Sequence, residues 1–313
     1  MTMQTLHITN GDIMTERLLE LSIPGDILTW NEMLCEGQAI EQLDSEAHIN
    51  KRKIFFNEVY GLEFEDDKFQ KDIDKLNHAN QYTDVILWFE YDLFCHINLM
   101  AAISLLRQKH VNLPIYLVCS GRIEGEDSLK GLGELTQSQL LNHFDNKISL
   151  NQTDLELAET LWGIYCGKDH NLFKPFIVKK SSFEYLNSCL KAHLERFPSS
   201  INGLNVLENN ILQLIKDHNI KSRHHLLGYV LNYQGYYGYG DLQIERLIDN
   251  LSIFFKETKD SIALNRKGHE ALLGQHNFAL ELNNNIYYGG INRLEYQFSK
   301  TENKLIKTPI NAN

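Results

Sequence analysis

Residues 83–100 read TDVILWFEYDLFCHINLM, and this stretch decides the fold. Five apolar residues, Val85 to Phe89, are followed at once by acidic residues and then by a helical pattern. An uninterrupted apolar run of this length is typical of a strand covered on both faces, as in the middle of a parallel sheet. Ligands in open α/β sheets collect at the carboxyl ends of strands. Glu90 and Asp92, which follow the run, therefore mark the first candidate site.

Three further stretches are predicted to join this strand in one sheet. They are residues 5–9, residues 27–30 and the apolar run IYLVCS at residues 115–120. Helical patterns follow the first and the central strand, at residues 13–21 and 93–109. Strands that alternate with helices predict a parallel sheet with helices on both faces. The predicted class is therefore α/β, with a mainly parallel, Rossmann-like sheet domain over residues 1–150.

The remainder of the chain is predicted to be helical and then mixed. Residues 151–202 are expected to form a helical connector. From Gly203 the pattern gives three helices, a hairpin around Lys256 to Asp260 and a short helix, which is the order of a winged helix. We expect a winged-helix-like domain with a terminal β-hairpin over residues 203–300, and a flexible polar tail over residues 301–313.

The distribution of charge argues against nucleic acid as a partner. The chain has 313 residues and a formal net charge of −11. Residues 1–200 hold 18 basic and 30 acidic side chains, whereas residues 201–300 hold 10 of each. The third helix of the winged-helix-like domain is expected to expose two acids and one base among five polar residues: Gln243, Glu245, Arg246, Asp249 and Asn250. Contacts to phosphate need the opposite balance, so protein contact or packing is favoured over DNA binding.

Composition and cysteine usage predict a soluble cytoplasmic protein. The chain is 43% hydrophobic and 23% charged, and no apolar run reaches the roughly 18 residues of a membrane span. No basic and apolar leader resembling a secretory signal opens the sequence. The five cysteines form no C-x-x-C pair, which favours reduced thiols. Cys95 beside His96 invites a nucleophilic reading, but neighbouring helical residues point in different directions, so a packing role is favoured.

Polar residues also follow the other predicted strands. Asp12 comes after an Asn-Gly turn between a strand and a helix, where helix amides can hold an anion. The candidate catalytic residues are Glu90, Asp92 and Asp12, and the candidate ligand-binding residues are His7, Asn10, Gly11, Glu36 and His96. His7, Asp12, Glu36, Glu90 and Asp92 are expected to border one cleft. Together with Glu32, converging carboxylates there would suit Mg²⁺ with a phosphorylated substrate, or acid and base chemistry.

Several stretches occur in the order of a known bacterial family. They are LHITNGD at residues 6–12, PGDILTWNEMLCEG at residues 24–37 and WFEYDLFCHINLM at residues 88–100. GLGELTQSQL from Gly131, LAETLWGIY from Leu157 and HLERFPSSINGLNVLENNIL from His193 extend the match over most of the chain. In this the chain resembles the family called domain of unknown function 1835. The family pattern has glutamine where this chain has His96, and often proline where it has Gln38. The resemblance implies no activity.

Three functions remain open at this point. The first is a domain that binds a small ligand, phosphorylated or a nucleotide, at the carboxyl edge of the parallel sheet, with or without catalysis. The second is a regulatory or adaptor protein that uses the winged helix for protein or DNA contact. The third is an interaction scaffold without a ligand. The oligomeric state is left open.

Overall fold

The main sheet of the protein contains five strands in the order β2-β1-β4-β5-β6. The computed structural model describes residues 4–126 and 128–309. The strands are β1 (Gln4–Asn10), β2 (Asp26–Trp30), β4 (Tyr82–Trp88), β5 (Ile115–Val118) and β6 (Ile148–Ser149). The first four pair in parallel, and β6 pairs antiparallel with β5 at the edge. The predicted mainly parallel sheet, with its four strands side by side, is confirmed.

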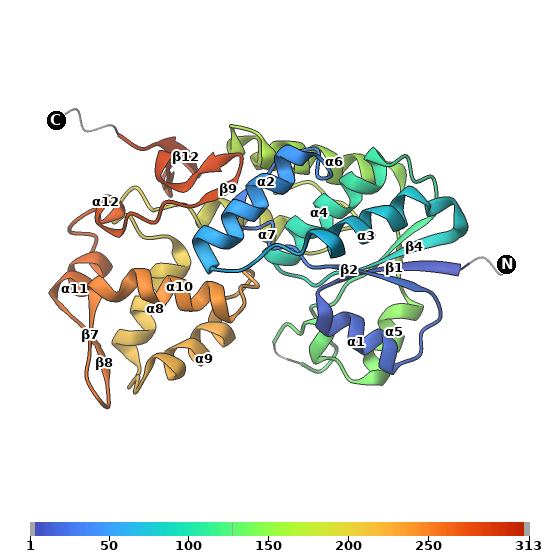
Figure 1. Cartoon of the computed structure of the whole chain (residues 1–313). Coiled ribbons are helices and arrows are strands. Elements are labelled where there is room, and N and C mark those ends of the chain that lie inside the picture. Colours follow the sequence, from blue (N-terminus) through green and yellow to red (C-terminus); the bar gives the residue numbers. More distant parts are fainter. Residues whose placement is uncertain (1–3, 127, 310–313) are drawn as a thin grey trace.

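Helices cover both faces of this sheet. Alternate side chains of the central strand are therefore buried on opposite sides. Ile86 and Trp88 of β4 pack in one cluster with α1 (Asp12–Glu20) and α5 (Gln137–Asp145). Val85 and Leu87 belong to the larger cluster on the other face, with α4 (Leu93–Gln108). The two layers lie below and above the sheet in Figure 1. Burial on both faces explains the uninterrupted apolar run.

The segment between β2 and β4 adds a short strand and two helices to the second face. It contains β3 (Gly37–Gln38), α2 (Glu46–Phe55) and α3 (Asp66–Asn77). The Ser45 hydroxyl caps α2 by accepting a hydrogen bond from the His48 amide. α2 runs on into a π-helical turn, Phe56–Tyr60, which ends at Gly61 in the left-handed conformation.

Residues 151–202, which were expected to form a helical connector, form a further layer of helices outside α4. Its helices, α6 (Gln152–Cys166) and α7 (Leu186–Glu195), both contact α4. This cover explains why α4 is buried along most of its length. Residues 151–202 therefore complete the core of the sheet domain instead of linking two separate cores.

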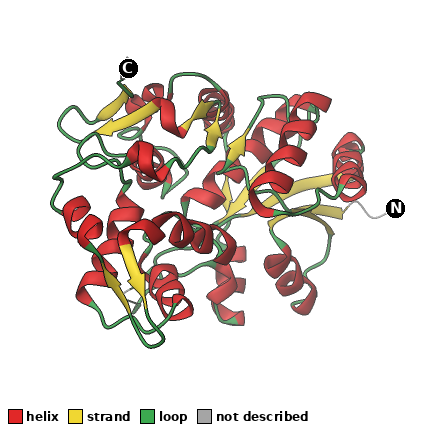
Figure 2. Ribbon diagram, turned by 60° about the vertical axis from the view of Figure 1, so that its left-hand side comes forward, coloured by secondary structure: helices red, strands yellow, loops and turns green. Residues whose placement is uncertain are grey.

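The C-terminal part has the predicted order of three helices, an antiparallel hairpin and a short helix. These elements are α8 (Val206–Asp217), α9 (Arg223–Tyr233), α10 (Asp241–Asn250), β7 (Phe255–Glu257), β8 (Ile262–Leu264) and α11 (Arg266–Leu272). Their apolar residues belong to the same large cluster as the second face of the main sheet. Figure 2 shows this mainly helical part beside the sheet, with the small hairpin at its outer side.

The expected exposure of α10 is wrong at two of its five polar positions. Gln243 is 1% exposed and donates to the Sγ of Cys35, with 3.4 Å between the atoms. The guanidinium of Arg246 forms an ion pair with Glu36, at 2.6 Å. The physical reason is that α10 packs against the N-terminal part, so its polar face pairs with buried groups there. Glu245 and Asp249 are exposed, as expected.

One small sheet joins the N-terminal part of the chain to the C-terminal part, and a second small sheet lies within the C-terminal part. The chain after α11 forms α12 (Ala279–Leu282), β9 (Tyr287–Gly289), β10 (Ile291–Asn292), β11 (Tyr296–Ser299) and β12 (Lys304–Lys307). β3 pairs in parallel with β9, which pairs antiparallel with β10. β12 pairs antiparallel with β11, and Leu305 is 3% exposed. Residues 304–307 are thus structured where a flexible tail was expected; residues 310–313 lie outside the described residues.

We expect Arg246→Met to lower the free energy of unfolding by about 3–5 kcal/mol, because it leaves the buried Glu36 carboxylate without its cation. The double variant Glu36→Gln/Arg246→Met should recover part of this loss, since no unpaired charge remains. Urea unfolding of the full chain measures both. Arg266→Met is the control, because Arg266 is 91% exposed in its ion pair and should change stability by less than about 0.5 kcal/mol. A loss at Arg246 no greater than this control would contradict the assignment.

Candidate functional site

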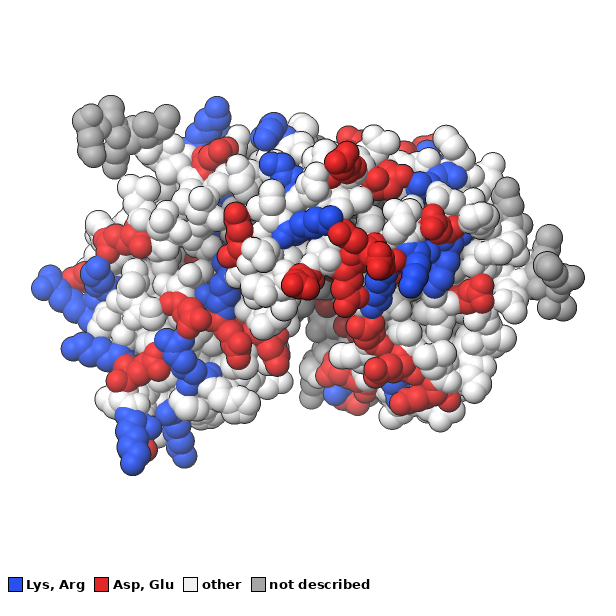
Figure 3. Space-filling model, in the orientation of Figure 1, with Lys and Arg blue, Asp and Glu red and all other residues white. Residues whose placement is uncertain are grey.

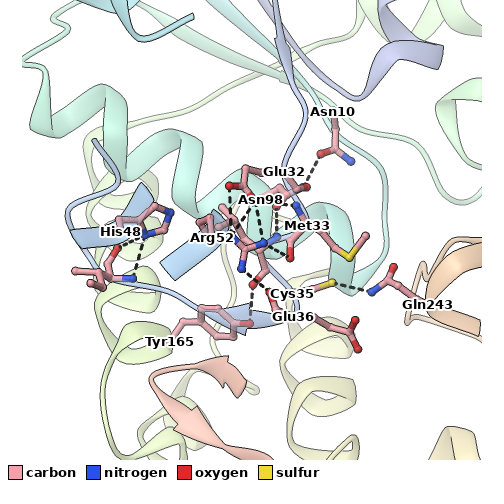
Figure 4. Close-up of polar contacts among 12 residues, drawn as sticks. Asn10, Glu32, Met33, Cys35, Glu36, His48, Arg52, Asn98, Tyr165 and Gln243 are labelled. Carbon is pink, nitrogen blue, oxygen red and sulfur yellow. Dashed lines mark hydrogen bonds and ion pairs between the residues drawn. The ribbon is translucent and has the colours of Figure 1, made fainter. Parts of the chain in front are cut away.

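The segment that follows β2 is held by one buried arginine. The guanidinium of Arg52, on α2, forms an ion pair with Glu32 at 2.9 Å and is fully buried. It also donates to the backbone carbonyls of Met33, at 2.9 Å, and Glu36, at 2.7 Å. Figure 4 shows these contacts converging on the guanidinium. Three directions of the guanidinium fork are therefore used to fix the shape of residues 32–36.

A buried asparagine ties the same segment to the end of β1. The side-chain amide of Asn98, on α4, donates to the Oδ1 of Asn10 at 2.8 Å and to the carbonyl of Glu32 at 2.7 Å. Its Oδ1 accepts from the amide of Leu34 at 3.2 Å. Asn10 in turn donates to the Sγ of Cys95 at 3.0 Å. Asn10 is thus engaged within the protein, at the carboxyl edge of the sheet where it was expected (Figure 4).

Glu36 connects the N-terminal part to the C-terminal part. Its carboxylate is fully buried, pairs with Arg246 and accepts a short hydrogen bond from the hydroxyl of Tyr60. Arg246 also donates to the Tyr60 hydroxyl and to the Oδ1 of Asn284, at 3.2 and 3.0 Å. These contacts use both carboxylate oxygens of Glu36, which gives it a structural role in place of the predicted ligand contact.

Glu90 and Asp92 lie together at the carboxyl end of β4. The Oε1 of Glu90 accepts from the amide of Gly133 at 3.2 Å. A Cβ on Gly131 would lie 2.6 Å from the Oε2 of Glu90, so a larger residue at position 131 would have to displace this carboxylate. Burial, followed by the charge of Asp92, raises the pKa of Glu90 to about 7. Glu90 is therefore poised to gain or lose a proton near neutral pH.

Asp92 has a structural role at the start of α4. Its Oδ1 accepts from the amide of Cys95 at 2.8 Å and caps α4. The carboxylate is 6% exposed and lies against Gly238, which has φ +67° and no room for a Cβ. Burial raises its pKa. Asp92 thus connects the start of α4 to the chain that leads into α10.

One group of side chains has the proximity of a metal site. Donor atoms of Glu90, Asp92 and Cys95 all lie within 4.8 Å of one another. Burial raises the pKa of the Cys95 thiol well above its usual value, so this thiol is protonated. Mg²⁺ takes oxygen ligands, and the two carboxylates are the groups here that could supply them.

The two predicted histidines are packed inside the protein. His7 lies in the middle of β1, where its Nδ1 accepts from the indole nitrogen of Trp88 at 3.1 Å. The ring nitrogen Nδ1 of His96 lies 2.9 Å from the carbonyl of Asp92. Burial lowers the pKa of both, to about 4 for His96. Each ring is 1% exposed and neutral at physiological pH, which is the behaviour of a hydrogen-bonded core histidine.

A cavity of about 340 Å³ opens between the end of β2 and α3, and we call it the α3 cavity. Its apolar wall comes from β2, the π-helical turn and the loop after it, α3 and α4: Leu28, Trp30, Phe56, Leu62, Phe64, Phe69, Ile73, Leu76 and Leu105. Its polar lining is mostly acidic: Asp12, Thr29, Asn31, Glu32, Glu63, Glu65, Lys68 and Asp72. It therefore lies at the carboxyl edge of the sheet, where ligands collect in such folds.

Of the predicted catalytic and ligand-binding residues, Asp12 is the one that lines the α3 cavity. Asp12 lies on the rim of the α3 cavity, where its carboxylate accepts from Asn31 at 3.0 Å and lies 3.5 Å from the ammonium of Lys68. His7, Glu36, Glu90 and Asp92 are not part of the lining. Gly11, at the turn before Asp12, has φ +91° and open space beside it. Strand ends alone do not determine convergence, because successive side chains along a strand point to opposite faces of the sheet.

Sequence reasoning missed most of the cavity lining. Lys68, Phe69, Asp72 and Ile73 all lie on α3, and the sequence signal was available, because residues 69–80 are recognisable as an amphipathic helix. The sequence did not show that this helix leaves a space against β2.

No protein-family model matches the chain, and no curated protein matches it either. In residues 4–126 and 128–309, no helix has both the length and the apolar character needed to cross a membrane. The functional argument therefore rests on the geometry of this chain.

We expect Glu90→Gln to be more stable than the wild-type protein at pH 8 and about equally stable at pH 4, where Glu90 is protonated in the folded state and largely protonated in the unfolded state. The pKa of Glu90 is about 7 in the folded protein and near 4.5 when it is unperturbed. The folded state therefore binds the extra proton between these values, and the stability contributed by this group falls as pH rises from about 4.5 to 7. The difference should grow by at most about 1.4 kcal/mol per pH unit in that window. Thermal unfolding at both pH values measures it, and a difference independent of pH would show that Glu90 titrates normally.

Proposed function

We propose that the protein binds a small molecule in the α3 cavity. The observation that carries the proposal is an apolar cavity with polar groups at its mouth, at the carboxyl end of a parallel strand. Its volume of about 340 Å³ falls within the range of small-molecule sites. Apolar and aromatic walls supply burial, and a few polar groups orient the ligand.

Part of the wall of this cavity belongs to the packed core of the fold. Leu28 and Trp30 belong to β2, and Leu105 belongs to the buried helix α4. Glu32 is fixed by the guanidinium of Arg52. A site held on strands and packed helices loses little freedom when a ligand binds, which favours affinity. The proposal concerns binding and does not depend on proton transfer by Glu90, which lies outside the lining.

The proposal predicts that Ile73→Trp abolishes binding in the α3 cavity. Ile73 is 5% exposed and lies in the wall, so the larger ring would fill part of the space. A set of small aromatic and heterocyclic compounds should raise the melting temperature of the wild-type protein, because a ligand that binds the folded state stabilises it. The same compounds should leave the melting temperature of Ile73→Trp unchanged.

The matched control is Ile13→Trp. Ile13 is 71% exposed on α1 and is not part of the cavity lining, so this variant should respond to the compounds as the wild-type protein does. The proposal fails if compounds that stabilise the wild-type protein stabilise Ile73→Trp equally. It also fails if no compound of the set acts on the wild-type protein.

For residues 203–274 we propose a winged-helix-like module that serves packing within the chain. The order of α8, α9, α10, the β7–β8 hairpin and α11 supports this assignment, and so does the bridge of Ile220 to Ile262 of the hairpin. The third helix of such modules commonly enters DNA. Here its residues Gln243 and Arg246 contact Cys35 and Glu36, so these groups are not available to a duplex.

The full-length protein should accordingly show no tight binding to random duplex DNA at about 150 mM salt. Its acidic charge and the engaged polar face of α10 both oppose phosphate contacts. Fluorescence anisotropy with a labelled duplex measures this. A submicromolar complex that weakens steeply with salt would contradict the packing role.

A further inference from the structure

We infer that the ligand of the α3 cavity is a small organic cation, with an ammonium group on an apolar or aromatic body. This inference rests on the proposed binding function and adds the chemical class of the ligand. The cavity has two properties that together select this class: an excess of carboxylates and a group of contacting aromatic rings.

The first property is the charge of the lining. Five carboxylates line the cavity and only one lysine does. Arg52 and Lys75 lie outside the lining and pair with Glu32 and Asp72, at 2.9 and 3.6 Å. Even when these two cations are counted, acids exceed bases by two. Such an excess in a concave, partly apolar site attracts cations and repels phosphate and carboxylate groups.

Two of these carboxylates are placed to meet a ligand. Asp72 has 18% of its side chain exposed, and burial raises its pKa, so a nearby cation would relieve an existing cost. In the described residues the carboxylate of Glu65 makes no ion pair within 4.0 Å, and it lies on the exposed rim. In Figure 3 acidic side chains gather over the half of the molecule that carries α3 and α1.

The second property is the aromatic wall. The ring of Phe64 lies 6.0 Å from that of Phe56 and 5.6 Å from that of Phe69, measured between centroids, and all three rings line the cavity. The indole of Trp30 lines it as well. The faces of such rings attract ammonium groups and pack against apolar bodies. Carboxylates at the mouth and aromatic rings in the wall therefore suit an aromatic or alkyl amine.

Three indoles that share one body and differ in charge test the inference. They are tryptamine, which is cationic, tryptophol, which is neutral, and indole-3-acetate, which is anionic. Isothermal titration of the full-length protein at pH 7.5 should give the tightest binding for tryptamine, by about tenfold over indole-3-acetate. Added salt should weaken tryptamine binding and leave tryptophol binding nearly unchanged.

Charge-neutralising variants locate the effect. Asp72→Asn and Glu65→Gln should each weaken tryptamine binding several-fold and leave tryptophol binding unchanged. Asp74→Asn is the matched control, because Asp74 lies on the same helix, is exposed and is not in the lining. Lys68→Met should strengthen tryptamine binding, because it removes the one lysine of the lining. Equal effects of Asp72→Asn and Asp74→Asn would contradict a local contact.

The outcomes separate this inference from the proposed function. If tryptophol or indole-3-acetate binds as tightly as tryptamine, and Ile73→Trp abolishes that binding, the cavity binds ligands without preferring cations and the inference is wrong. If none of the three indoles binds the folded wild-type protein, the inference is wrong, and the compound set applied to Ile73→Trp decides the proposed function separately.

Discussion

The buried guanidinium of Arg52 is the constraint on which the rest of the arrangement depends. A charge that is fully buried must be paired and hydrogen-bonded, or the fold loses several kcal/mol. Arg52 meets this requirement with the carboxylate of Glu32 and two backbone carbonyls from the chain after β2. The chain there has no regular structure of its own between β2 and β3, so these bonds define its path. The position of Glu32 in the cavity wall and that of Glu36 beneath α10 both follow from that path.

The N-terminal sheet domain and the C-terminal helices share one apolar core, although their architectures differ. The ion pair of Glu36 with Arg246 joins residues 210 positions apart, and β3 pairs with β9 near the other end of the chain. One apolar cluster extends from Leu6 in the sheet to Leu282 in α12. A change in the C-terminal helices thus alters the burial of groups in the N-terminal part, and the two parts are expected to unfold together.

The sheet could be predicted from the sequence because its signals are local. The run from Val85 to Phe89 is apolar on both faces, and the adjacent Asp92 caps the next helix as its position suggests. The candidate site was harder, because it depends on pairings between distant residues. Nothing near Glu36 in the sequence indicates that its partner is Arg246, on a helix whose polar face was expected to be exposed. The contacts that bury a carboxylate, and so decide between structure and function, are set by tertiary packing.

The π-helical turn at Phe56–Tyr60 has a consequence for how the molecule responds to what it binds. Phe56, at its start, lies in the wall of the α3 cavity, and Tyr60, at its end, donates a hydrogen bond to the carboxylate of Glu36, which pairs with α10. Five residues of one irregular turn thus belong to both regions, and such turns are frequent where helices serve a function. A ligand that shifted this turn would therefore also shift the hydroxyl of Tyr60 at the α10 contact, and by linkage a change at that contact would alter ligand affinity equally. The turn therefore connects the α3 cavity directly to the contact between the N-terminal and C-terminal parts of the chain.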